Sequence, residues 1–344
     1  MKTFKMMAMA FMAVAMCANF ASCSNEDTVL DEPKGEEYVT VKLGCGGEIL
    51  DIKNSPLSRA EGESILDDND LLLLTLHEME KYEDSWGDVS YYEKSIYAYA
   101  VMSYPGESLE LNLLKGREYR VQASVIVDGK DSYSVGCNSG EKVSYDMSSI
   151  DSYYLSEIHR VRDGQYGYDR FYGMVNNFTA DEGVAVNVDL KRVAYGVEFK
   201  VNENELSDGE SLMIKVARYS DSFYEYDGDY AVNLDSKDRS HYRVKTMNEI
   251  NEAWSNAMQG NECTEVMHVT ITWNKNVVNE ETDEVTGTEE INMGTYEISF
   301  KRNAKTRITI KPQDLTAGGS VSFTVESWGE DVYFDIENGQ VTQK

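Results

Sequence analysis

The sequence predicts an all-β protein built as two tandem β-sandwiches with one short inserted helix. Apolar and polar residues alternate along many short runs, Gly, Asp and Asn separate these runs, and one stretch alone shows helical spacing. Alternation with a period of two places one face of a strand on a core and the other in water. Many short strands between turn residues are typical of sandwiches.

The expected strands follow one another along both halves of the chain. In the first half they are Tyr38–Leu43, Ile96–Val101, Leu109–Leu113, Tyr119–Val127 and Val184–Leu190. In the second half they are Tyr195–Val201, Val269–Trp273, Tyr296–Phe300, Ile308–Ile310 and Val321–Val325. Turn pairs such as Lys115-Gly116 and Asp128-Gly129 separate several of them. Two halves of this size fit two sandwiches in series.

One helix is expected between strands of the second half, over Met247–Gln259. Thr246 and Glu249 have the spacing of a capping box, and Gly260 is a suitable stop. The apolar stripe with helical spacing is Met247, Ile250, Trp254, Ala257 and Met258. We interpret this stripe as a packing face rather than a cofactor site.

The first residues predict export and lipidation. Residues 1–22 form a signal peptide with Lys2 and Lys5 before an apolar run that is too short to span a bilayer permanently. Cleavage between Ser22 and Cys23 would leave Cys23 as the acylated first residue, carrying palmitate or similar chains. The alternative is an ordinary signal peptide with a chance Cys. Residues 23–37 are polar and predict a flexible tether.

The acidic residues at 24–27 resemble the surface-export signal of lipoproteins in some Gram-negative anaerobes, which implies the outer face of the outer membrane. The sandwiches are then expected at 38–190 and 191–344. The chain has 61 acidic and 32 basic side chains, a formal net charge of −29. This balance argues against nucleic acid and against adsorption to an anionic membrane surface.

The sequence contains no recognisable catalytic or metal-binding pattern, so we expect neither an enzyme nor a cofactor. The four His residues lack metal-ligand spacing, and there is no nucleophile elbow or phosphate-binding glycine loop. Cys45, Cys137 and Cys263 are too widely spaced to define a zinc site or a disulfide framework. Their disulfide state stays open.

The 23 tyrosines crowd into two polar stretches, Tyr153–Tyr172 and Tyr219–Tyr242. Tyrosine offers stacking area and a hydroxyl at low entropic cost, which suits recognition loops. The candidate recognition residues are Tyr166, Tyr168, Tyr224 and Tyr226. The alternative, which we favour, is that these tyrosines pack within strand edges and loops.

Four local patterns in order resemble the fimbrillin family, the lipoprotein subunits and anchors of type V fimbriae. They are the strand Val39–Leu43 with the loop Ser55–Ala60, then Leu113–Val121, Val188–Phe199 and Phe300–Asn303. The resemblance covers nearly the whole mature chain. It implies two transthyretin-like sandwich domains and no catalysis.

The resemblance also implies assembly by strand addition, in which a donor strand from one subunit fills a groove in the next. In polymerising members a protease cuts after an Arg in the loop that follows the first strand and opens the groove. Arg59-Ala60 is the matching candidate maturation site. The alternative is an ordinary exposed loop Arg.

The expected function is therefore a lipid-anchored surface component of fimbriae that acts in adhesion. Its partners would be the outer membrane through its lipid, and other fimbrial subunits or a host or bacterial surface ligand. Stalk subunits carry a long donor segment at the carboxyl end, whereas this chain continues only from Trp328 to Lys344. An anchor or tip role is at least as well supported. The alternative function is a surface glycan-binding lipoprotein of a polysaccharide uptake system.

Overall fold

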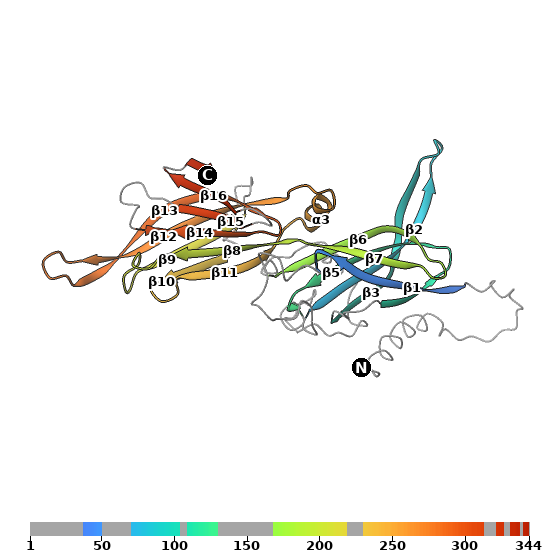
Figure 1. Ribbon diagram of the computed structural model, residues 1–344, viewed down its shortest axis with the longest axis horizontal. Helices are drawn as coiled ribbons and strands as arrows, with labels where there is room; N and C mark the ends of the chain where they lie inside the picture. The colour runs from blue at the N-terminus through green and yellow to red at the C-terminus, as the bar shows by residue number, and fades with distance from the viewer. Residues whose placement is uncertain are drawn as a thin grey trace, which may run out of the picture. The chain divides into compact units, whose positions relative to one another are not determined.

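The structure is a computed structural model of the chain. It describes residues 37–49, 70–103, 109–129, 168–218 and 230–312, together with the strands at 321–326, 331–337 and 340–343. Strands dominate these residues and one α-helix lies among them, which confirms the all-β prediction (Figure 1). The expected signal peptide and nearly all of the tether lie outside the described residues.

The first half forms a seven-stranded sheet with the order β3-β2-β5-β6-β7-β1-β4. Its strands are β1 (Tyr38–Gly47), β2 (Leu71–Glu83), β3 (Val89–Ser103), β4 (Leu109–Leu114), β5 (Glu118–Ile126), β6 (Arg170–Thr179) and β7 (Ala185–Arg192). β6 and β7 pair through Phe171↔Arg192 and Tyr172↔Lys191. This short pairing joins two parts of the sheet, strands β3-β2-β5-β6 and strands β7-β1-β4, and each part buries a row of apolar side chains.

β2 was not expected from alternation, because it buries both faces. Leu71, Leu72, Leu73 and Leu74 are all at most 3% exposed. Leu71 and Leu73 belong to a core cluster that also contains Val193 and residues of the second half. A run of consecutive leucines therefore marks a strand covered on both sides.

The second half forms two sheets, of four strands in the order β10-β9-β12-β13 and six in the order β11-β8-β14-β15-β16-β17. The strands are β8 (Ala194–Val201), β9 (Ser211–Arg218), β10 (Tyr230–Asp235), β11 (Ser240–Thr246), β12 (Thr264–Val278), β13 (Val285–Lys301), β14 (Lys305–Ile310), β15 (Val321–Glu326), β16 (Asp331–Glu337) and β17 (Gln340–Gln343). One cluster contains Phe199 of β8, Ile214 of β9, Ile271 of β12 and Ile308 of β14. The apolar faces of the two sheets thus pack together as a sandwich.

The single described helix, α3 (Ile250–Met258), lies between β11 and β12 as expected, but it begins later than the capping-box spacing predicts. Thr246 ends β11 opposite Ala194, and its hydroxyl donates to the carbonyl oxygen of Tyr168 at 2.7 Å. Its oxygen therefore does not cap the helix, and Glu249 precedes the helix without a side-chain cap bond. Gly260 ends the helical segment with φ +73°.

The predicted packing face of the helix is correct in part. Ile250 and Ala253 are buried, whereas Met258 is 47% exposed. Met247 is buried but precedes the helix. The inward face is therefore shorter than the apolar stripe of the sequence.

Glu198 links two parallel strands of the six-stranded sheet and should make folding sensitive to acid. Its carboxylate on β8 lies 2.8 Å from Lys305 Nζ and accepts a 2.8 Å hydrogen bond from Arg307 Nε, both on β14. Burial opposes ionisation of this carboxyl, but hydrogen bonds from these two cations outweigh burial and hold its pKa below 4.5. The folded state therefore binds this proton less readily than the unfolded state does.

Replacing Glu198 with Gln should consequently reduce stability most at neutral pH. The difference in unfolding free energy between the parent chain and E198Q should shrink as pH falls below the ordinary value of 4.5. Urea titrations of both proteins across this range measure it. A difference that does not change with pH would show that Glu198 ionisation does not contribute.

Candidate functional site: the first-strand groove and the junction

Strand β1 occupies a groove between two other strands. It pairs antiparallel with β4, with Val41 opposite Leu111, and parallel with β7, with Leu43 opposite Val186. Its alternate residues Val39, Val41 and Leu43 are 5%, 0% and 2% exposed. Without β1, the facing edges of β4 and β7 would lose their main-chain partners and an apolar groove would lie open.

The end of β1 approaches β7 so closely that side chains are excluded. A Cβ atom on Gly47 would lie 1.9 Å from Asp189 Oδ1, and Gly47 has φ +86°. A Cβ atom on Gly46 would lie 3.0 Å from Asn187 Nδ2. The segment Gly44-Cys45-Gly46-Gly47 therefore fits this strand end because three of its four residues lack a Cβ atom.

The structure describes Cys45 and Cys263, two of the three cysteines whose disulfide state the sequence leaves open, and both are free thiols. Cys45 of β1 is half-buried, and burial raises the pKa of its thiol to about 11. Cys263 is also half-buried, and burial raises the pKa of its thiol too. Both thiols are therefore protonated at neutral pH. Cys137 lies outside the described residues.

Arg192, at the end of β7, is the centre of a buried polar network. Its side chain is 1% exposed, and its Nε and Nη2 donate to the two carboxylate oxygens of Asp169 at 2.9 and 2.6 Å. The guanidinium lies 5.0 Å from the ring centroid of Phe171. A two-pronged ion pair of this kind fixes the orientation of both groups.

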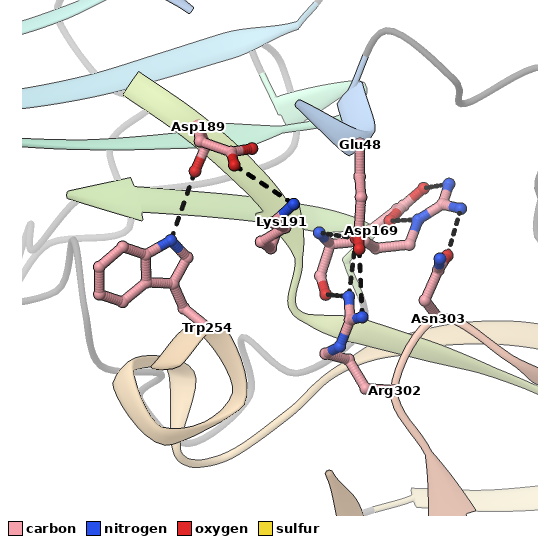
Figure 2. A network of polar contacts seen from close by, with 8 residues as sticks. Glu48, Asp169, Asp189, Lys191, Trp254, Arg302 and Asn303 are labelled. Atoms are coloured by element: carbon pink, nitrogen blue, oxygen red, sulfur yellow. Dashed lines mark hydrogen bonds and ion pairs between the residues drawn. The ribbon is translucent and has the colours of Figure 1, made fainter. Parts of the chain in front are cut away.

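Glu48 connects this network to the second half of the chain. Its carboxylate accepts from the backbone N–H of Arg192 at 2.9 Å and from Arg302 Nη1 and Nη2 at 2.7 and 3.1 Å (Figure 2). Arg302 Nη1 also donates to the carbonyl oxygen of Arg192 at 2.8 Å, and Arg192 Nη1 donates to Asn303 Oδ1 at 3.2 Å. The residue directly after β1 thus ties β7 to the β13–β14 turn.

Helix α3 meets the first half of the chain at β6 and β7. Trp254 Nε1 donates to the carbonyl oxygen of Asp189 at 3.3 Å, and its ring contacts that of Tyr172 edge to face at 5.9 Å between centroids. Lys191 Nζ lies 3.3 Å from the other end of the same residue, Asp189 Oδ2 (Figure 2). Through Trp254, the helix therefore adds an aromatic contact and a hydrogen bond to the Glu48–Arg302 ion pair that links the two halves.

Trp254 should contribute measurably to stability through both contacts. Trp254→Phe removes the indole N–H and should lower the unfolding free energy by about 1 kcal/mol, the net value of a typical hydrogen bond. Trp254→Ala also loses the ring contact and should cost more. Met258→Ala, at a 47% exposed position of the same helix, is the control and should change little. Equal effects for W254A and M258A in urea unfolding would contradict the packing assigned to this helix.

The structure brings several of the sequence patterns together: Val39 of the first pattern pairs with Leu113 of the second. The segments Val188–Phe199 and Phe300–Asn303 meet at Arg192, Arg302 and Asn303. Tyr168 is half-buried and packs against the core cluster. The remaining candidate residues lie outside the described part, so their roles stay predictions: Ser22, Cys23, Arg59, Ala60, Tyr166, Tyr224 and Tyr226.

Sequence reasoning missed Glu48 and Asp169. Both are single carboxylates in an acidic chain, without a motif around them. The pairing of Arg302 with Glu48 joins residues 254 positions apart. Among the described residues, no group of three or more His, Cys, Asp or Glu side chains is arranged for a metal ion, and no helix has the length and apolarity needed to cross a membrane.

Similarity to known proteins is found among solved structures. No protein-family model matches the chain, and no curated protein matches it. Among solved structures, the chain is similar to the tip fimbrial protein Mfa3 of Porphyromonas gingivalis, with 12% identity over 85% of this chain and 100% of that one and a TM-score of 0.40. It is also similar to the fimbrial anchor protein Mfa2 of the same organism, with 9% identity over 88% and 98% and a TM-score of 0.34.

A third similar structure is described as a putative polysaccharide-binding protein from Bacteroides thetaiotaomicron. It shares 8% identity over 89% of this chain and 98% of that one, with a TM-score of 0.36. Two of these three structures are fimbrial proteins, the kind of protein that the sequence patterns resemble.

Proposed function

We propose that this chain is a lipid-anchored, surface-exposed component of fimbriae that accepts a donor strand in place of β1. The proposal assigns the lipid to Cys23, the cut to Arg59-Ala60 and the acceptor groove to the space between β4 and β7. The two sandwiches at 38–190 and 191–344 would act as structural units, without a catalytic step. The segments that resemble the fimbrillin family support this role.

The observation that carries the proposal is the position of β1. It lies between two strands and supplies the apolar row of Val39, Val41 and Leu43. A cut after Arg59 would separate β1 from the rest of the chain, so that hydrogen bonds and buried side chains alone would hold it. A strand held in this way can be exchanged for one that fits better.

The groove sets the sequence that a donor needs. Apolar residues must recur at every second position to replace the buried row, because a shift of one residue would turn that row to solvent. A donor that runs in the same direction as β1 would pair antiparallel with β4 and parallel with β7. The donor must also carry small residues where β1 has Gly46 and Gly47.

The carboxyl-terminal strands support an acceptor role more than a donor role. β16 pairs with β15, and β17 pairs with β16 as the outer strand of the six-stranded sheet. β16 is therefore paired on both edges within its own chain, and β17 is paired on one edge. A component at one end of a fimbrium, an anchor or a tip, needs either a groove or a donor strand, and this arrangement favours the groove.

Lipidation at Cys23 and cleavage at Arg59 have opposite consequences for an anchor and for a tip component. Cys23 and Arg59 lie on the same fragment as β1, so a cut chain would stay on the membrane through β1 alone. A donor that displaces β1 would then release the chain from its lipid. Acceptance of a donor in place of β1 therefore fits a tip component, which is cut before it joins a fimbrium, whereas an anchor would keep β1 and remain uncut.

Membrane fractionation of cells tests the lipid and the cut together. The parent chain should fractionate with the outer membrane, and Cys23→Ala should release it. Arg59→Ala should block cleavage and leave the chain lipid-bound. If C23A stays in the membrane fraction, the lipid assignment is wrong.

Assembly of the purified soluble chain tests strand addition itself. We expect the C23A chain to be monomeric when intact and to form larger species with fimbrial subunits after an Arg-specific protease cuts at Arg59, as measured by light scattering. The double variant C23A/R59A is the matched control and should stay monomeric after the same treatment. A cut chain that never associates would contradict the proposal.

A further inference from the structure

The hairpin of β2 and β3 continues beyond its sheet as a two-stranded ribbon. β2 pairs with β5 as far as Met79, and from Glu80 to Tyr92 the two strands pair with each other (Figure 1). Register shifts after Leu76 and after Glu78 come directly before this segment. Such bulges bend and twist a strand, which turns the ribbon away from the sheet.

Aromatic side chains are unusually exposed on this ribbon. Trp86 at the turn is 89% exposed, Tyr82 is 55% exposed and Tyr92 is 58% exposed. Tyr82 and Tyr92 contact each other edge to face at 6.1 Å between centroids. Val89 adds a further exposed apolar side chain. An aromatic cluster in water marks an interaction site in a soluble domain, because burial of these rings on a partner is favourable.

The turn that carries Trp86 is held in one conformation. Asp84 Oδ1 accepts from the backbone N–H groups of Trp86 and Asp88 at 2.8 and 2.9 Å. The main chain adds Asp84 N–H to Asp88 O at 3.0 Å and Gly87 N–H to Asp84 O at 3.1 Å. Gly87 has φ +84°, which glycine adopts without strain. A partner would therefore meet a preformed tip, at a small ordering cost.

The charges of the tip select the class of partner. Glu83, Asp84 and Asp88 flank Trp86 in the sequence, and residues 82–92 contain no Lys, Arg or His. The faces of indole and phenol rings attract cations, and neighbouring carboxylates strengthen this attraction. A guanidinium or ammonium group fits both features, whereas an anionic surface is repelled.

We propose that the ribbon tip formed by Tyr82, Trp86, Tyr92 and the carboxylates of Glu83 and Asp88 binds Arg or Lys side chains of a basic segment in a partner protein. The site lies on the β2–β3 hairpin and uses no residue of β1, so it is independent of strand addition. Trp86 stacks on the cation, and the carboxylates orient it. The net charge of −29 also attracts such a partner from a distance.

The β12–β13 hairpin supplies an internal control within the same chain. β12 pairs with β9 as far as Asn274, and residues 275–289 pair within the hairpin or form its turn. This second ribbon carries Glu280, Glu281, Asp283 and Glu284, and residues 275–289 contain no aromatic residue. It therefore has at least as much negative charge as the first tip, without the rings.

Calorimetric titration of the full C23A chain with a synthetic peptide of alternating Arg and Gly tests the proposal. We expect binding that Trp86→Ala weakens by about tenfold or more, as for an aromatic hot-spot residue. Trp86→Phe should retain part of the affinity because it keeps a ring. The double variant E280Q/E281Q should bind like the parent chain. Thermal unfolding should be the same for all variants, because these side chains are exposed.

Two results would overturn the proposal. If E280Q/E281Q weakens peptide binding as much as W86A, the attraction is general to acidic surface. If the peptide does not bind while a neutral glycan binds the parent chain and not W86A, the tip recognises sugar rather than a basic segment.

Discussion

Replacing Arg192 with Ala should lower the unfolding free energy by about 3–5 kcal/mol, the usual cost of removing one partner from a buried ion pair. The guanidinium is 1% exposed and bonds to both oxygens of Asp169. Its loss leaves the Asp169 carboxylate without this partner. Water cannot fully replace the partner, because the Asp169 side chain is only 14% exposed. It also removes the hydrogen bond to Asn303 in the β13–β14 turn. Arg192→Lys should recover part of the loss, because an ammonium cannot reproduce the two-pronged geometry.

Urea unfolding of the C23A chain measures the effect of Arg192, and an exposed ion pair provides the control. Lys115 and Glu182 lie 3.2 Å apart, with side chains 33% and 76% exposed. Glu182→Ala should change stability by no more than about 1 kcal/mol, as exposed pairs do. If R192A costs no more than E182A, the junction network does not stabilise the fold.

Replacing Val41 with Asp is expected to be comparably severe. Val41 is 0% exposed, and its side chain is in the middle of the apolar row of β1. A carboxylate there loses its hydration without a cationic partner among the residues of that row, which costs several kcal/mol in protein interiors. The strand should therefore leave the groove more often.

The neighbouring residue gives the matched control for Val41. Thr40 is exposed, and its hydroxyl donates to Asn112 Oδ1 at 3.0 Å on the outer face of the sheet. Thr40→Asp adds the same charge to the same strand and should cost no more than about 1 kcal/mol. Hydrogen exchange of the β4 and β7 amides should be faster in V41D and unchanged in T40D. Similar exchange in both variants would mean that Val41 does not hold β1 in place.

Alternation predicts the strands that bury one face and fails where burial is different. β1, β7 and β14 lie where the sequence places them because each alternates between core and solvent, and β8 alternates in this way from Val197 to Val201. β2 escapes this rule because Leu71–Leu74 are buried on both faces. The predicted helix start is wrong for a related reason. Thr246 is the last residue of β11 and pairs with Ala194 of β8, so it cannot serve as the helix cap that the local pattern predicts.

The junction could be located from the sequence in part, but not its chemistry. The segments around Arg192 and Arg302 stand out because they resemble family motifs. Their partners do not, since Glu48 lies 144 residues before Arg192 and 254 before Arg302, with no local pattern to link them. Long-range ion pairs depend on how strands are ordered, which single-sequence periodicity does not contain.

The position of Glu48 couples exchange of β1 to the stability of the junction. A fragment cut at Arg59 would carry β1 and Glu48 together, so exchange of β1 would also remove the carboxylate that binds Arg302. A donor strand that ends in a carboxylate at this position would restore the tie. A donor without it would leave the junction with the Arg192–Asn303 and Arg302–Arg192 hydrogen bonds and the Trp254 contact.

Native mass spectrometry of the cut chain tests the central claim most directly. The C23A chain is cut at Arg59 and mixed with an excess of a peptide that copies the ten residues Tyr38–Gly47 of β1. We predict that the peptide replaces the amino-terminal fragment one for one, and that a peptide with Val41→Asp does not. An original fragment that never exchanges, or a cut chain that binds both peptides equally, would contradict the claim that β1 fills an acceptor groove.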